Sequence, residues 1–336
     1  MLGCHRMFIV SLLFYSGFKS ITRTKQMLTT LAVKTASGGL FSKLKTGASK
    51  LISSAAKMSL QAKYETLAVT VPHEFVYHVE LNRPEKLNAM SKTMWFEIGK
   101  CFETLDSDEN CRVVVLSGAG KVFTAGLDLK DAMDMAPELA EQEDVARKAK
   151  IVVAKLRGYQ KSLTAIELCK KPVVAAVHSA CIGGGVDLIA ATDMRYCSKD
   201  AWFQVKEVDI GMAADVGTLQ RLPKIIGSDS WAREVCYTAR KVQAPEALSS
   251  GLVSRVFEDK ESLIKGAIDI AQDIAKKSPV AVQGTKVSLV YARDHSVQDG
   301  LNQIAVWNQL MLQSEDFTNA VVAQATKQKD VVFSKL

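Results

Sequence analysis

From about Glu65 onward, short apolar segments alternate with longer segments of helical periodicity, and this alternation strongly limits the possible folds. Ser91 precedes the segment 92–105, whose apolar residues fall on one helical face, and a long helical stretch follows over 129–170. Beyond Val216 the pattern is almost all helical. The short segments rich in β-branched or aromatic residues predict strands at 75–81, 112–118, 171–179 and 194–198. The sequence therefore predicts an α/β protein with a helical C-terminal third.

The net charge of +7 is unevenly distributed along the 336 residues. Residues 1–64 contain ten Lys and Arg and no Asp or Glu, so the remaining 272 residues carry 33 basic and 36 acidic residues, a net charge of −3. A mildly acidic domain is not typical of a nucleic-acid-binding protein. The seven cysteines include no CxxC pair, which argues against a disulfide framework or a zinc site. We expect neither a metal nor another cofactor.

The two ends of the chain resemble targeting signals. Residues 1–60 have the composition of a mitochondrial leader, and the apolar segment 7–18 within them is too short to span a membrane. The last three residues, Ser334-Lys335-Leu336, form the tripeptide that the peroxisomal import receptor binds. We therefore expect the protein in the mitochondrial matrix and in peroxisomes, with no membrane span. The alternatives are a disordered basic tail and a frayed C-terminus.

Three successive glycines, Gly183 to Gly185, separate the strand 171–179 from an apolar run that carries Asp187. The first N–H groups of a helix have no partner within it, and a glycine there lets a ligand approach the backbone. A second glycine-containing junction, at 123–130, also follows a buried strand and precedes a helix. One amide from each junction would form an oxyanion hole, in which a single donor contributes about 3 to 4 kcal/mol in the transition state. The alternative is that the glycines serve only a turn or close packing.

Five motifs together resemble the enoyl-CoA hydratase/isomerase, or crotonase, superfamily over roughly residues 65–336: NRPEKLNAM, FTAGLDLK, AAVHSACIGGGVDL, ATDMRY and EALSSGLVSRV. The resemblance implies a crotonase-type spiral of ββα units over 65–260. It also implies a helical C-terminal region over 261–333 that builds a homotrimer, often paired into a hexamer. The expected substrate is an acyl-CoA thioester.

The resemblance also assigns substrate contacts. The backbone N–H groups of Leu127 and Gly184 would form the oxyanion hole for the thioester oxygen. The neighbouring positions Ala125, Gly126, Asp128 and Leu129 would line the substrate site together with these two. The Asp128 carboxylate itself is interpreted as structural or facing solvent.

Three acids suggest which reaction the family resemblance implies. Asp187 and Glu207 match the two carboxylate positions of the family's hydratases, whereas Asp215 occupies a position where the hydratase pattern has glycine. The set most closely resembles the members that convert a 3,5-dienoyl-CoA to its 2,4-isomer during unsaturated fatty-acid β-oxidation. In those members Asp215 would remove a proton from C2, Glu207 would return one at C6, and Asp187 would tune Glu207.

Each of these acids also has a structural interpretation. Asp215 could be a helix N-cap, Glu207 a surface charge at a strand end, and Asp187 a first-turn acid that the helix dipole favours. Two other functions remain possible at this point. One is an enoyl-CoA hydratase, and the other is a non-catalytic crotonase-fold protein that binds RNA or acyl-CoA.

Overall fold

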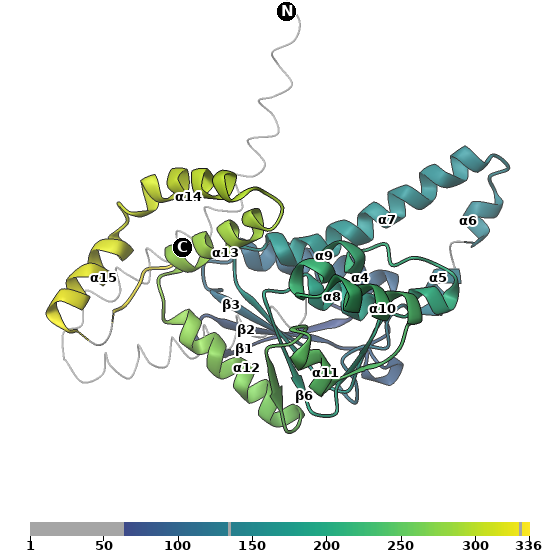
Figure 1. Cartoon of the computed structure of the whole chain (residues 1–336), viewed down its shortest axis with the longest axis horizontal. Coiled ribbons are helices and arrows are strands. Elements are labelled where there is room, and N and C mark those ends of the chain that lie inside the picture. The colour runs from purple at the N-terminus through teal and green to yellow at the C-terminus, as the bar shows by residue number, and fades with distance from the viewer. Residues whose placement is uncertain (1–63, 134–135, 329–330) are drawn as a thin grey trace, which may run out of the picture. The chain divides into compact units, whose positions relative to one another are not determined.

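A six-stranded sheet forms the centre of the computed structural model of this chain, which describes residues 64–133, 136–328 and 331–336 (Figure 1). The predicted leader, residues 1–60, lies outside the described residues. β1 and β2 are antiparallel, and the remaining neighbours are parallel. The strands follow the order β1 (Leu67–His73), β2 (Val76–Leu81), β3 (Val113–Gly118), β4 (Val173–Val177), β6 (Met194–Ser198) and β9 (Arg255–Phe257). The four strands predicted from the sequence are confirmed as β2, β3, β4 and β6.

Both faces of the sheet are buried. Successive side chains of β3 point to opposite faces and pack against different helices. Val113 and Val115 pack with α12 (Lys260–Ala275) on one side. Val114 and Leu116 belong to the core on the other side, formed with α4 (Lys92–Asp106) and α7 (Val145–Leu168). Complete burial of each such side chain stabilises the fold by about 1.5 to 3 kcal/mol. Figure 1 shows α12 on one side of the strands and α4 and α7 on the other.

The N-terminus of α4 forms as predicted. Ser91 has extended backbone angles, and its side chain accepts a hydrogen bond from Met94 N–H at 3.3 Å. The apolar face of this helix is buried, as expected for a core-facing helix: Met94, Trp95, Ile98, Phe102 and Leu105.

A second, smaller sheet contains strands that the sequence did not reveal. It consists of β5 (Ala180–Ile182), β7 (Trp202–Gln204) and β8 (Val242–Gln243). Strands of two or three residues are too short to show an alternating pattern. For the same reason the prediction of an almost entirely helical segment beyond Val216 missed β8 and β9. The stretch 129–170 is not one helix but three, α5 (Leu129–Met133), α6 (Ala136–Ala140) and α7.

The other helices connect the strands and form the C-terminal region. Short helices lie near the ends of strands: η1 (Pro84–Lys86), α8 (Gly184–Ala190), η2 (Glu207–Ile210), α9 (Thr218–Ile225), α10 (Asp229–Thr238) and α11 (Ala244–Ser249). The chain then continues as α13 (Pro279–Ala292), α14 (Val297–Met311) and α15 (Glu315–Thr326), which lie together beside the sheet region in Figure 1. Lys286 joins α13 to the core, because its buried Nζ lies 2.7 Å from the Asp193 carboxylate and donates to Lys171 O at 3.0 Å.

The last residues of the chain lie against the core. Arg112 Nη2 donates to the carbonyl oxygens of Phe333 and Ser334 at 2.7 and 3.1 Å, and its Nη1 donates to Ala275 O at the end of α12. Lys335 Nζ donates to Asn110 Oδ1 at 2.5 Å.

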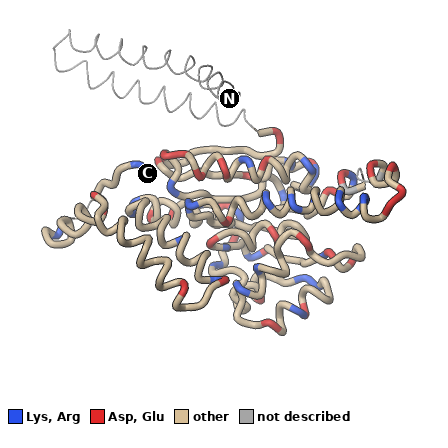
Figure 2. The backbone as a smooth tube through the Cα atoms, turned by 90° about the horizontal axis from the view of Figure 1, so that it is seen from above, with Lys and Arg blue, Asp and Glu red and all other residues tan. Residues whose placement is uncertain are grey.

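Acidic and basic residues are interspersed along the described backbone, as Figure 2 shows. Within the part of the chain that the structure describes, no helix is both long enough and apolar enough to cross a bilayer.

Candidate active site

The three predicted acids and both predicted oxyanion amides come together around one cavity of about 370 Å³. Asp187, Glu207 and Asp215 line it together with Leu127 and Gly184. These residues are far apart in sequence, and the parallel strands bring them together because the loops after β3 and β4 leave the sheet at the same edge. The cavity walls are mainly apolar, as expected for a site that binds an acyl chain.

The two glycine-containing junctions run side by side, which brings the two amides toward each other. Thr124 N–H donates to Ala180 O at 3.0 Å, and Ile182 N–H donates to Thr124 O at 3.2 Å. Thr124 therefore pairs with position 181 in a parallel bridge. Leu127 and Gly184 each lie three residues further along these two segments, and both line the cavity.

The peptide groups on either side of Leu127 are held in place. Met90 N–H donates to Gly126 O at 2.7 Å, and Asp128 N–H donates to Met90 O at 3.2 Å. The Leu127 N–H between them donates to no protein acceptor in the described ranges. It is available to a ligand oxygen in the cavity.

The second amide belongs to the first residue of α8. Gly183 has φ +51°, a left-handed conformation that favours glycine, and it precedes the helix as its N-cap. Gly184 begins the helix, and its N–H also donates to no protein acceptor among the described residues. A Cβ at Gly184 would lie 3.0 Å from the Trp95 ring, so a larger residue would intrude on the cavity wall. The prediction that a helix begins here is confirmed.

The carboxyl groups of the cavity are shifted toward their protonated forms. Burial, followed by the charge of Asp187, raises the pKa of Glu207 to about 7. Burial is also the main cause that raises the pKa of Asp187 to about 6 and that of Asp215 above its usual value. Clustered carboxyl groups in an apolar wall suit proton transfer near neutral pH, because one can hold a proton while another accepts one.

The structure also tests the alternative interpretations of these acids. The N-cap of α9 is Gly217, without a side-chain hydrogen bond, so the N-cap interpretation of Asp215 is wrong. Glu207 lines the cavity, and its buried Oε2 has no hydrogen-bond partner within the described residues. Asp187 does lie in the first turn of α8, and it also accepts a hydrogen bond from Thr218 N–H.

Asp128 differs from its neighbours in the predicted substrate segment. Ala125, Gly126, Leu127 and Leu129 line the cavity, whereas Asp128 does not. Its Oδ2 accepts a hydrogen bond from Arg83 Nη1 at 3.0 Å, and this bond is the main reason that the pKa of Asp128 is lowered. The structural interpretation of its carboxylate therefore agrees with its contacts.

Several cavity residues were not found from the sequence. Val152, Leu156 and Tyr159 reach the cavity from α7, and Trp95 reaches it from α4 although it is also part of the core. Lys206, beside Glu207, brings a positive charge to the same wall. An apolar stripe on a helix gives the same pattern whether it faces a core or a cavity, so no sequence signal separates the two cases.

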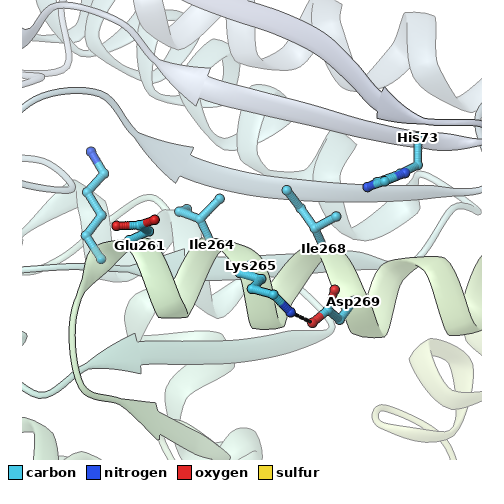
Figure 3. Close-up of a pocket in the computed structure, with 7 residues that line it drawn as sticks. His73, Glu261, Ile264, Lys265, Ile268 and Asp269 are labelled. Carbon is cyan, nitrogen blue, oxygen red and sulfur yellow. Dashed lines mark hydrogen bonds and ion pairs between the residues drawn. The ribbon is translucent and has the colours of Figure 1, made fainter.

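A second hollow, of about 630 Å³, lies along α12 (Figure 3). Figure 3 shows Ile264 and Ile268 on the helix and Lys265 paired with Asp269, an ion pair of 2.7 Å between exposed side chains. None of the three predicted acids and neither predicted amide lies here. This hollow therefore lacks the groups that the expected chemistry needs.

Within the described residues, no group of three or more His, Cys, Asp or Glu side chains is placed to hold a metal ion. The six cysteines there are free and buried. Proton transfer by carboxyl groups beside two free amides requires no metal.

A sequence model of the family described as enoyl-CoA hydratase/isomerase matches residues 73–331. The chain belongs to this family. A mouse relative named Delta(3,5)-Delta(2,4)-dienoyl-CoA isomerase, mitochondrial, is 54% identical over 277 residues, which cover 81% of this chain and 84% of the relative. An Arabidopsis thaliana relative with the same enzyme name, designated peroxisomal, is 47% identical and covers 76% of this chain and 91% of the relative.

Among solved structures, an enoyl-CoA hydratase from Bacillus anthracis has a TM-score of 0.71 and 28% identity, covering 80% of this chain and 98% of the hydratase. The family membership and the fold class predicted from the sequence are confirmed. The fold is mixed α/β with a mainly helical C-terminal region. That these helices build a trimer stays a prediction.

Proposed function

We propose that the protein isomerises 3,5-dienoyl-CoA thioesters to 2,4-dienoyl-CoA thioesters. The observation that carries this proposal is the presence of Asp187, Glu207 and Asp215 in one apolar cavity with the free amides of Leu127 and Gly184. Relatives at 54% and 47% identity that are named for this reaction support the same activity.

The proposed reaction moves one proton at each end of a conjugated system. The thioester oxygen accepts hydrogen bonds from the N–H groups of Leu127 and Gly184. The Asp215 carboxylate removes a proton from C2, and the electron pair left at C2 delocalises over the C3=C4 and C5=C6 bonds and the thioester oxygen. Glu207 then donates its proton to C6, so that the double bonds finish at C2=C3 and C4=C5. Asp215 returns its proton to water and Glu207 recovers one before the next cycle.

The electrostatics of the cavity suit these roles. A proton donor with a pKa of about 7, as at Glu207, is largely protonated at and below neutral pH. Asp187, which is close enough to raise that pKa, tunes the donor rather than reacting itself. The oxyanion amides stabilise the enolate because their dipoles are already oriented and water is excluded around them.

The direct test is incubation of the purified protein with a 3,5-dienoyl-CoA. The product has two double bonds conjugated with the thioester, so its ultraviolet absorption lies at longer wavelength than that of the substrate. Hydration of a simple 2-enoyl-CoA is measured in parallel. If hydration is the dominant activity, the protein is an enoyl-CoA hydratase and this proposal is wrong.

We infer that the protein acts in fatty-acid β-oxidation in mitochondria or peroxisomes. This rests on the names of the mouse and Arabidopsis relatives, which are designated mitochondrial and peroxisomal. Fractionation of cells that express the full chain, followed by immunoblotting of both organelles, tests the inference. Recovery in the cytosol alone contradicts it.

We also propose that the protein is a homo-oligomer, a trimer or a hexamer. The helices α13 to α15 expose large apolar side chains that a single chain leaves uncovered: Leu289, Leu301, Val306, Leu310, Phe317 and Val321. Burying such a face against other copies is favourable by about 25 cal/mol for each Å² of apolar surface. Light scattering after size-exclusion chromatography measures the mass, and a monomer contradicts the proposal.

A further inference from the structure

The loop that carries Asp215 also supplies the N–H group that contacts Asp187. It lies between η2 and α9 and enters α9 at Thr218. Thr218 N–H donates to Asp187 Oδ1 at 2.5 Å. The position of this loop therefore affects two of the three cavity acids at once.

Two side chains hold this loop from the side of α7 and α9. Gln160 Nε2, on α7, donates to the Asp215 carbonyl oxygen at 2.7 Å. Arg221, on α9, packs directly against Gly217 and lies 3.5 Å from Val216 O through its Nη1. Gly217 has φ +142°, and a Cβ at this position would overlap the Arg221 guanidinium. The loop backbone therefore packs directly against the guanidinium group.

The guanidinium is itself anchored to α7. Arg221 Nε and Nη2 donate to Glu167 Oε2 at 3.1 and 2.8 Å, and Nη2 also donates to Thr164 Oγ1 at 3.1 Å. The side chains of Arg221 and Glu167 are only 11% and 9% exposed, so little solvent competes with these contacts. Glu167 is also paired with Arg293, at the C-terminal end of α13. The chain of contacts therefore joins the cavity loop to α7 and to the C-terminal helices.

Two guanidinium groups in this cluster contact one carboxylate. Arg221 and Arg293 share the single carboxylate of Glu167, and Asp187 is a further carboxylate close enough to interact with Arg221. Burial is the main cause that raises the pKa of Asp187; the hydrogen bonds from Thr218 lower it, and the charge of Arg221 lowers it less. The guanidinium thus acts on the acid site both through the loop backbone and through its charge.

We propose that Arg221, held by Glu167, is a positioning residue that fixes the loop 215–218 so that Asp215 and the Thr218 N–H face the acid cluster. Its role in turnover rests on the function proposed above. The competing explanation is that Arg221 and Glu167 form only a buried ion pair that stabilises the fold. Loss of one partner from such a pair is destabilising wherever it lies. Stability alone therefore does not separate the two explanations.

The matched control is Arg195→Met. Arg195 lies on β6, away from the cavity lining, and its partly buried guanidinium donates to the backbone oxygens of Leu252 and Thr192 at 2.8 Å each. Arg195→Met and Arg221→Met each remove a partly buried guanidinium that donates at least two hydrogen bonds. Both variants should lose thermal stability, and only Arg221→Met should change the acid site.

The experiment measures turnover and backbone exchange for the parent and both variants. In Arg221→Met we expect kcat to fall at least about tenfold with KM within about threefold, because a displaced base slows the chemical step more than binding. Hydrogen–deuterium exchange followed by mass spectrometry should show faster exchange in peptides that cover residues 215–222. Arg195→Met should show neither change.

Both changes together support the positioning role, and either change alone, or neither, overturns it. If Arg221→Met does not fold, Glu167→Gln replaces it, because glutamine keeps the shape and loses the charge; the same two measurements then decide. The exchange measurement does not depend on the reaction. If the parent fails to isomerise a dienoyl-CoA, the proposed function is wrong, and turnover of whichever acyl-CoA reaction the parent catalyses serves in its place.

Discussion

Asp187 Oδ1 accepts a hydrogen bond of 2.5 Å from the backbone N–H of Thr218, 31 residues further along the chain. The other carboxylate oxygen, Oδ2, is buried and has no hydrogen-bond partner among the described residues. One side of the carboxyl group is therefore fixed by the loop that follows Asp215. Burial is the main cause that raises the pKa of Glu207, and the negative charge of Asp187 raises it further.

The first prediction concerns this electrostatic effect of Asp187. Replacement by Asn removes the charge, so the pKa of Glu207 should fall from about 7 toward its ordinary value. Since Glu207 must carry a proton to act as the donor, the decline of kcat at high pH should begin at lower pH in Asp187→Asn. A pH profile of kcat from about pH 5 to 9 measures this shift.

The control for that profile is Asp269→Asn. Asp269 lies on α12, and its exposed carboxylate pairs with Lys265 at 2.7 Å. Neither residue of this ion pair lines the cavity. Removal of the Asp269 charge should leave the profile unchanged. A profile that shifts equally in both variants contradicts a specific effect of Asp187.

The second prediction concerns stability and follows from the raised pKa of Glu207. The folded protein holds this proton up to about pH 7, whereas the unfolded chain releases it near 4.5. Burial of the carboxyl group costs least when it is protonated. The free energy of unfolding should therefore fall as pH rises from 4.5 to about 7. Relative to Glu207→Gln, the parent should lose thermal stability from pH 4.5 to 7, measured as the difference in Tm. A difference that stays constant with pH contradicts a buried, protonated Glu207.

Local signals in the sequence predicted part of the fold and the site. The strand positions, the Ser91 cap and the start of α8 at Gly184 depend on residues within a few positions of one another. The N-terminus of α7 has a similar local signal, since Asp144 accepts a hydrogen bond from Arg147 N–H. The short strands β8 and β9 carry no comparable signal.

The contacts that hold the site in place could not be predicted from such local signals. Gln160 and Asp215 are 55 residues apart, and Arg221 and Glu167 are 54 residues apart. Nothing in the sequence near either residue identifies its partner. The three acids themselves could be assigned only through the family resemblance, because an isolated carboxylate has the same local pattern as an N-cap or a surface charge.

The third prediction tests the oxyanion role of Gly184. In Gly184→Val the added side chain meets the Trp95 ring and the Met90 Sδ atom, which lie 3.0 and 3.3 Å from a Cβ at this position. The acyl group should be displaced from the two amides, and kcat should fall by about 10²-fold or more. Gly227→Ala serves as the control, because a Cβ there meets nothing within 4 Å. Turnover near that of the parent in a folded Gly184→Val variant argues against the assignment.

The last prediction distinguishes the isomerase from a hydratase and concerns Asp215. Because Gly217 is the N-cap of α9, replacing Asp215 by Asn removes no helix cap, and the hydrogen bond from Gln160 to the backbone oxygen of residue 215 is kept. Tm should therefore barely change, whereas kcat for dienoyl-CoA isomerisation should fall by about 10²-fold or more through loss of the C2 base. Asp269→Asn, which removes an acid outside the cavity, should retain full activity. Both reactions are measured for each variant, isomerisation by the conjugated product and hydration with a simple 2-enoyl-CoA. Full isomerisation in Asp215→Asn would show that another group removes the C2 proton, since an asparagine side chain cannot accept one at neutral pH.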